Sequence, residues 1–118
     1  TNMRSMFRGA DSFNADIGGW DVSSVTNMEA MLKAAPSFNQ DISAWQVQNV
    51  TNFIDFIASS AMTTANYDAL LIAWEQLSLK SNVTFGAGNI QYSSGAAANA
   101  RQSIINNYSW TFNDGGVI

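Results

Sequence analysis

A sequence motif of 25 residues occurs twice at the start of this chain, and a third copy begins directly after it. The copies open with Thr1-Asn2-Met3, Thr26-Asn27-Met28 and Thr51-Asn52-Phe53. A fixed period of this length is typical of structural units that stack on one another, rather than of a globule with one central core. The first two copies are identical at thirteen positions, which in the first copy are Thr1, Asn2, Met3, Met6, Ala10, Ser12, Phe13, Asn14, Asp16, Ile17, Trp20, Val22 and Val25.

The first ten residues of each copy predict a short amphipathic helix. Apolar side chains fall at i, i+3, i+4 and i+7, which places them in one stripe along a helix. Thr26 stands at the N-cap of the second helix, with Glu29 three residues on, and Pro36 would end that helix. The stripe consists of Met3, Met6, Phe7 and Ala10 in the first copy, and of Met28, Met31, Leu32 and Ala35 in the second.

The second half of each copy predicts a strand. Ile17-x-x-Trp20-x-Val22-x-x-Val25 has the spacing of a leucine-rich-repeat strand, with valine at the asparagine position. Residues two apart on a strand point the same way, so Trp20 and Val22 should face inward and Asp21 outward. One short parallel strand and one helix per coil predict an α/β fold, a short leucine-rich-repeat-like solenoid.

After Thr51 the period stretches, and the rest of the chain predicts two more units. A helix from about Thr64 and a strand over 83–85 form the first of them. A helix capped by Ser94 and a strand over 110–112 form the second. We interpret 1–118 as a single solenoid domain, with regular repeats in 1–60 and degenerate C-terminal capping repeats in 61–118.

The repeated phrase resembles the repeat of about 25 residues in BspA-like bacterial surface proteins, which include mycoplasma-type surface lipoproteins. It reads Thr-Asn-Met-x-x-Met-Phe-x-x-Ala-x-x-Phe-Asn-x-Asp-Ile-x-x-Trp-Asp-Val-Ser-x-Val, and the resemblance is strong over residues 1 to about 57. The segment from Thr64 to Gly116 is similar to the part that follows such arrays. The resemblance implies a leucine-rich-repeat-like fold, surface exposure and adhesion or contact with a host or matrix partner. It implies no catalytic residues.

Composition excludes several classes of function. The chain has no histidine and no cysteine, which excludes catalysis by those residues, thiolate metal sites and disulfides. Its net charge of −4 and five scattered basic residues argue against nucleic acid and anionic membrane as partners. No signal peptide or long apolar run is present, so we expect no membrane insertion in this segment. We also expect no cofactor. Because the chain opens on the first residue of a repeat, we expect a segment of a longer protein.

The outward positions of the predicted strands form the candidate binding face. If the strands stack in register, Asp21, Gln46, Thr84 and Thr111 lie in one row, joined by Ser23 and Gln48. Repeat proteins commonly bind along such a surface. The alternative is that these side chains are only solvated.

Two other sets of residues have a functional and a structural interpretation. Asp16 and Asp41 stack in adjacent coils and, with carbonyl oxygens, are candidate Ca²⁺ ligands, or each accepts N–H bonds from its own turn. The tryptophans suit stacking on a sugar or peptide, although their place in apolar stripes favours core packing. These are Trp20, Trp45, Trp74 and Trp110.

These observations predict a non-enzymatic segment of an extracellular or cell-surface bacterial protein, which contacts a protein or a host or matrix ligand through the solenoid surface. The alternative is a structural cap that closes a longer array and has no ligand of its own. An enzyme has little support, because the spacing of Asp68, Glu75 and Asp114 gives no reason for these carboxylates to converge. We also expect self-association through the uncovered N-terminal coil.

Overall fold

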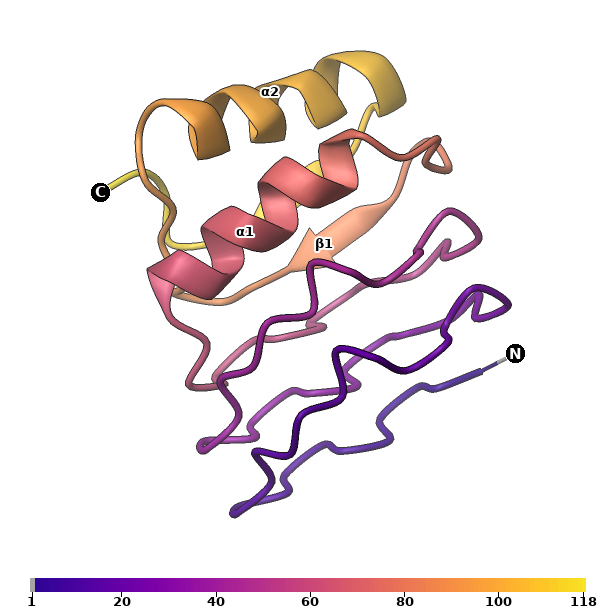
Figure 1. Cartoon of the computed structure of the whole chain (residues 1–118), viewed down its shortest axis with the longest axis vertical. Coiled ribbons are helices and arrows are strands. Elements are labelled where there is room, and N and C mark those ends of the chain that lie inside the picture. The colour runs from indigo at the N-terminus through magenta and orange to yellow at the C-terminus, as the bar shows by residue number, and fades with distance from the viewer. Residues whose placement is uncertain (1) are drawn as a thin grey trace.

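The computed structural model describes residues 2–118, and Thr1 lies outside the described residues. In chain order the elements are α1 (Thr64–Glu75), β1 (Thr84–Gly86), α2 (Ala96–Tyr108) and β2 (Thr111–Asn113). Figure 1 shows the N-terminal half as stacked loops of chain at one end, with α1 and α2 side by side at the other.

The repeated segments stack with like residues aligned, as the period of 25 indicates. Asn2 pairs with Asn27 in a parallel bridge, and Asn27 pairs with Asn52 in the same way. We refer to residues 2–25, 26–50 and 51–60 as coils 1, 2 and 3. The parallel pairing lies at the start of each coil.

The helices predicted at the start of each coil are absent, and that prediction was wrong. The segment from Met3 to Ala10 is a run of four-residue turns, in which Met6 N–H donates to the Met3 carbonyl and Ala10 N–H to the Phe7 carbonyl. Ser5 and Gly9 have φ values of 57° and 70°. A left-handed residue interrupts a right-handed helix, so the apolar stripe arises from the spacing of turns. Coil 2 repeats the pattern at Ala30 and Ala34, and coil 3 at Asp55 and Ser59.

The strands predicted in the second half of each copy are absent as well. Trp20 N–H donates to the Ile17 carbonyl, and Val25 N–H donates to the Val22 carbonyl, so this half of the coil also consists of turns. Three of the four apolar residues in this half of coil 1 are still buried, namely Ile17, Val22 and Val25. The pattern therefore identified the core positions and misassigned the backbone.

The C-terminal half agrees more closely with its prediction. Helix α1 begins at Thr64 as expected, and its N-cap Thr63 accepts a hydrogen bond from Asn66 N–H. The helix buries one face, made of Tyr67, Leu70, Leu71 and Trp74, and Leu77, which lies beyond the helix, is half-buried. The two strands form a parallel pair in the register Thr84–Thr111 and Phe85–Phe112. The capping prediction for Ser94 was wrong, because the N-cap of α2 is Gly95 and makes no side-chain bond.

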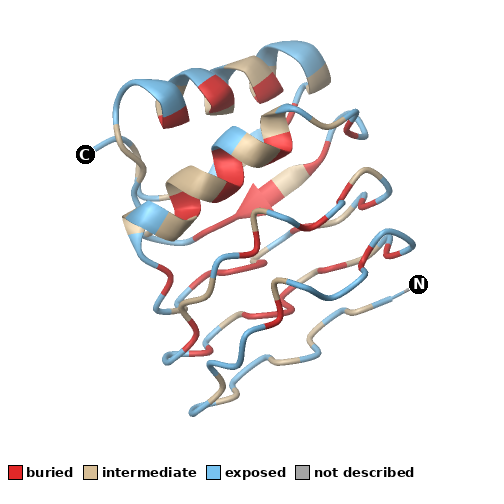
Figure 2. Ribbon diagram, in the orientation of Figure 1, coloured by how far each residue is buried: buried red, intermediate tan, exposed pale blue. Residues whose placement is uncertain are grey.

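One continuous core joins the two halves, as the buried residues in Figure 2 show. Phe53 lies at the junction, with its ring 5.3 Å from those of Trp74 and Phe85 and 5.8 Å from that of Trp110. Gly86 permits this junction, since a Cβ there would collide with the backbone of Asp55. The chain thus changes from coils to helical units without a break in its apolar interior.

Candidate interaction surfaces

The six predicted binding residues do not form one row, because β1 aligns with the start of coil 3. Phe85 forms a parallel bridge with Phe53, and this places Thr84 beside Asn52. Thr111 follows, as the partner of Thr84. The predicted alignment of Thr84 with Gln46 was therefore wrong. Residues 83–85 and 45–47 share an apolar–polar–apolar pattern, but the two segments do not occupy equivalent places in the structure.

Four of the six residues remain together on the turns of coils 1 and 2. Ser23 donates from its hydroxyl to Asp21 at 2.6 Å and from its N–H at 3.0 Å. These two bonds hold the pKa of the Asp21 carboxyl below its ordinary value. The amide of Gln48 donates to Gln46 at 3.0 Å. We call this set the turn patch: Asp21, Ser23, Gln46 and Gln48.

The observed register builds a different row, which runs along all five stacked units. Sequence reasoning missed its asparagines, although Asn2 is among the residues identical at an offset of 25. In each coil the asparagine oxygen accepts the N–H two residues on, as Asn27 does from Glu29 at 2.9 Å. The asparagine side chain thus starts the first turn of its coil and lies at the edge of the parallel bridges between coils. We call this set the asparagine–threonine row: Asn2, Asn27, Asn52, Thr84 and Thr111.

A second pair of asparagines joins the coils at another corner. Asn14 accepts the N–H of Asn39 at 2.8 Å, and Asn39 accepts the N–H of Thr63 at 3.0 Å. Each of the two asparagines thus binds the backbone of the next unit in the stack. The position is therefore structural, which accounts for an asparagine in both copies.

Charged side chains pair between coils on the exposed surface. Arg4 lies 3.6 Å from Glu29, and Lys33 lies 3.0 Å from Asp55. Such exposed pairs contribute at most about 1 kcal/mol each. The asparagine–threonine row itself carries no charge, and its Asn52 amide donates to the Glu29 carboxylate at 3.1 Å.

Asp16 and Asp41 each have a partner in their own turn. Asp16 accepts the N–H of Gly18 at 3.0 Å, and Asp41 accepts the N–H of Ser43 at 2.9 Å. Within residues 2–118 no group of three or more acidic side chains is placed to hold a metal ion. The geometry favours the interpretation of these carboxylates as turn-forming groups.

The tryptophans divide into buried and exposed. Trp45, Trp74 and Trp110 are buried, as core packing predicts. Trp45 also donates its indole N–H to the Ile17 carbonyl in coil 1 at 2.9 Å. Trp20, at the same position one coil earlier, is 41% exposed with its ring 5.8 Å from that of Phe7, so it is only partly packed into the core.

A charged cluster closes the C-terminal end. Asp114 accepts the phenol of Tyr67 at 2.6 Å and the guanidinium of Arg101 at 3.0 Å and 3.3 Å. The Asp114 side chain is only 2% exposed, and Arg101 lies over the Tyr92 and Phe112 rings. Burial, with the bond to Asp114, raises the pKa of Tyr67 above its ordinary range. These groups satisfy one another, so we interpret the cluster as a structural clasp between α1, α2 and the residues after β2.

The other two carboxylates considered for catalysis have separate partners. Asp68 accepts the N–H of Ser93 at 2.9 Å. Glu75 accepts from Gln76 at 2.8 Å and from Ser103 at 3.4 Å. Neither shares a hydrogen-bond partner with Asp114.

One open cleft of about 620 Å³ lies between the end of coil 3 and the turn after β1. No charged side chain lines it. No sequence signal indicated it, because its two walls lie far apart in the chain. Its lining is Ser59, Ser60, Ala61, Met62, Thr63, Thr64, Gly88, Asn89, Ile90 and Gln91.

Comparison with known proteins shows a family match. The sequence model of a family described as "Mycoplasma protein of unknown function, DUF285" matches residues 1–85. No curated protein and no solved structure matches the chain. Among the described residues, no helix has the length and apolar character needed to cross a membrane.

Proposed function

Because this chain belongs to the DUF285 family of mycoplasma proteins, we propose that it is a non-enzymatic segment of a BspA-like bacterial surface protein. In this proposal it is a short leucine-rich-repeat-like solenoid at the cell surface or outside the cell. It acts in adhesion, by contact with a protein or with a host or matrix ligand.

The asparagine–threonine row is the observation that carries this proposal. Its five side chains lie along one line across all the stacked units, and each is exposed or half-buried. Amide and hydroxyl groups both donate and accept hydrogen bonds, and they are cheaper to remove from water than ions are. Such a row suits a polar protein surface better than a charged polymer. The turn patch is a second contact surface on the same stack.

A second candidate function is a structural cap without a ligand. The outer face of α2 favours it, because that face is polar and the clasp fixes the helix in place. Terminal units of repeat proteins need such a face to keep the stack soluble. Its exposed residues include Asn99, Gln102, Asn106 and Asn107.

Lysine substitutions test the two surfaces separately. We expect Thr84→Lys to weaken binding to a matrix protein, selected from an immobilised panel, by about tenfold or more, because it puts a charge into a neutral row. Gln46→Lys tests the turn patch in the same way, and Gln102→Lys on α2 is the matched control. Circular dichroism confirms that each variant is folded.

Each outcome distinguishes the proposals. Equal binding by Thr84→Lys and Gln46→Lys would show that neither surface makes the contact. A chain that binds nothing on the panel, while a longer array of the same repeats binds, would favour the cap.

A further inference from the structure

The backbone ladder that joins the units is interrupted between coil 3 and the unit of β1. In coil 2, Ala34 N–H donates to the Ala58 carbonyl of coil 3 at 2.8 Å. Ser59 stands one period after Ala34, but within residues 2–118 its N–H has no acceptor. The last bond of this series in coil 3 joins Ile57 N–H to the Gly86 carbonyl at 3.0 Å. Coil 3 has coil 2 on its other side, and β1 has β2, so the interruption lies inside the stack.

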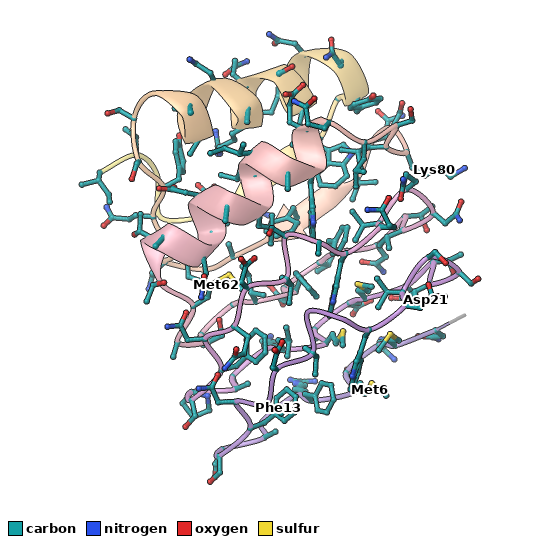
Figure 3. The ribbon with its side chains drawn as sticks, in the orientation of Figure 1. Met6, Phe13, Asp21, Met62 and Lys80 are labelled. Carbon is teal, nitrogen blue, oxygen red and sulfur yellow. The ribbon has the colours of Figure 1, made fainter. Side chains whose placement is uncertain are left out.

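The cleft of about 620 Å³ opens at this interruption, between two walls that touch at Gly88. Gly88 has a φ of 60°, and a Cβ there would lie 3.3 Å from the backbone of Ala58 and Ser59. Each wall contributes an apolar side chain. Met62, which Figure 3 shows beside the N-terminal end of α1, is buried, and Ile90 on the opposite wall is half-buried.

The wall after β1 has a backbone edge with unpaired groups. Tyr92 forms a parallel bridge with Val117, in which its N–H donates to Gly116 at 3.2 Å and its carbonyl accepts from Ile118 at 2.9 Å. Along an extended segment, the backbone groups of successive residues point to opposite sides. Gln91 therefore directs its N–H and carbonyl away from Val117, on the side of the cleft that it lines. Within residues 2–118 neither group has a partner.

The side chains of the lining are neutral, and several have no partner of their own. Among the described residues that line the cleft, none is charged and none is aromatic. A charged ligand would leave its ions unpaired there, and a sugar would find no ring on which to stack. Amides and hydroxyls both donate and accept, which suits the peptide group. Those that make no hydrogen bond within residues 2–118 belong to Ser59, Thr64, Asn89 and Gln91.

We propose that this cleft binds an extended, uncharged peptide segment, which pairs through its backbone with Gln91. One residue of the peptide donates to the Gln91 carbonyl and accepts from its N–H, and the opposite wall offers Ser59 N–H to a further carbonyl. An apolar side chain of the peptide lies between Met62 and Ile90. Strand addition at a sheet edge takes its affinity from main-chain bonds and its specificity from pockets for alternate side chains.

The size and place of the cleft agree with this role. Ligand pockets have volumes of roughly 300–1,000 Å³, and this cleft falls within that range. It shares no residue with the asparagine–threonine row or the turn patch. The inference therefore does not rest on the adhesion proposed for those surfaces, and either can fail without the other.

The test titrates the full chain with short peptides that are blocked at both ends and alternate valine with one polar residue. The polar residue is serine in the first peptide, threonine in the second and asparagine in the third. We expect at least one of them to cause saturable changes in the amide chemical shifts of Ser59 and Gln91, measured by NMR, because pairing brings both N–H groups into hydrogen bonds. Maltotetraose, a neutral sugar, is the control ligand and should leave these shifts unchanged.

N-methylated peptides separate backbone pairing from side-chain contact. One version is methylated at the valines and the other at the polar residues, so that each loses the N–H groups of one edge and keeps its side chains. Only one edge of the peptide can face Gln91. We therefore expect the two versions to differ in dissociation constant by about tenfold or more. Equal affinities of the parent peptide and both versions would contradict the proposed pairing.

A substitution in the lining places the contact. Ala61 is exposed and lines the cleft, so Ala61→Tyr should fill the cleft and leave the core intact. We expect it to raise the dissociation constant of the peptide by about tenfold or more. Ala96→Tyr changes an exposed alanine at the start of α2, outside the cleft, and should bind as the wild type does. Circular dichroism confirms that both variants are folded.

Three further results would overturn the proposal. One is the lack of a saturable shift at Ser59 and Gln91 with any of the three peptides. Another is equal binding by Ala61→Tyr and the wild type, which would place the contact outside the cleft. The third is saturable binding of maltotetraose at the same amides, which would assign the cleft to a neutral sugar.

Discussion

In coils 1 and 2, alternate N–H groups of the turn segment bond to the next coil, whereas the N–H groups of α1 and α2 bond within the helix itself. Met3 in coil 1 donates to Asn27, 24 residues away. A helical residue finds its acceptor four residues back. A coil therefore depends on its neighbour for its backbone bonds, and a helix depends on its neighbour only for burial. The contrast shows that the same substitution should have different effects in the two regions.

The joints between units also differ. Coils are joined by neutral amides, such as Asn14 accepting the N–H of Asn39, and by exposed ion pairs. The helical units are joined by the clasp, in which a nearly buried carboxylate meets a phenol and a guanidinium. Bonds to charged groups are roughly twice as strong as neutral ones but sensitive to protonation. Because the ion pairs between coils are exposed and the clasp is nearly buried, we expect the C-terminal units to respond to pH more strongly than the coils.

The largest effect should separate a covered coil from an uncovered one. Trp45→Ala should lower the free energy of unfolding by about 3–5 kcal/mol, because it empties a buried site and leaves the Ile17 carbonyl without its indole partner. Trp20→Ala removes a partly exposed side chain at the same repeat position, and should cost clearly less. Urea denaturation measures both. Equal losses would mean that the loss in free energy of unfolding depends on the position in the repeat and not on burial by a neighbouring coil.

A second effect should appear only in alkaline solution. The unfolded chain loses the proton of Tyr67 first, because the folded pKa is raised above the unfolded value of about 10. Above about pH 10 the free energy of unfolding should fall by up to about 1.4 kcal/mol per pH unit, whereas below it the contribution of Tyr67 is fully present. Denaturation curves of the wild type and Tyr67→Phe measure this slope. A Phe variant with the same slope would show that Tyr67 is not its source.

The smallest effect should distinguish equivalent turn positions in coils 1 and 2. Gly9 and Ala34 both have positive φ, at 70° and 55°. Gly9→Ala should cost about 1 kcal/mol, since a Cβ is unfavourable in this conformation. Ala34→Gly relieves that strain at some cost in chain entropy, and we expect a change near zero or a small gain. Thermal unfolding of both variants tests this; a clear loss for Ala34→Gly would contradict it.

Much of the C-terminal half could be predicted, because its signals are local. The stripe of α1 and the aromatic strands at Phe85 and Phe112 identify their elements from neighbouring residues alone. The candidate surface could not be predicted, because it depends on which segments pair. Thr84 belongs beside Asn52 since Phe53 and Phe85 pack in the core, and no spacing in the sequence connects them.

By itself the sequence determined the period of 25, most of the residues that face the core and the approximate positions of both helices. The tertiary structure alone decided that Met3 to Ala10 forms turns. Apolar spacing is the same for a short helix and for a run of four-residue turns, so the choice depends on where the N–H groups find acceptors. In this chain the acceptors are carbonyls of the neighbouring coil, and the sequence of a single repeat does not show that such a neighbour is present.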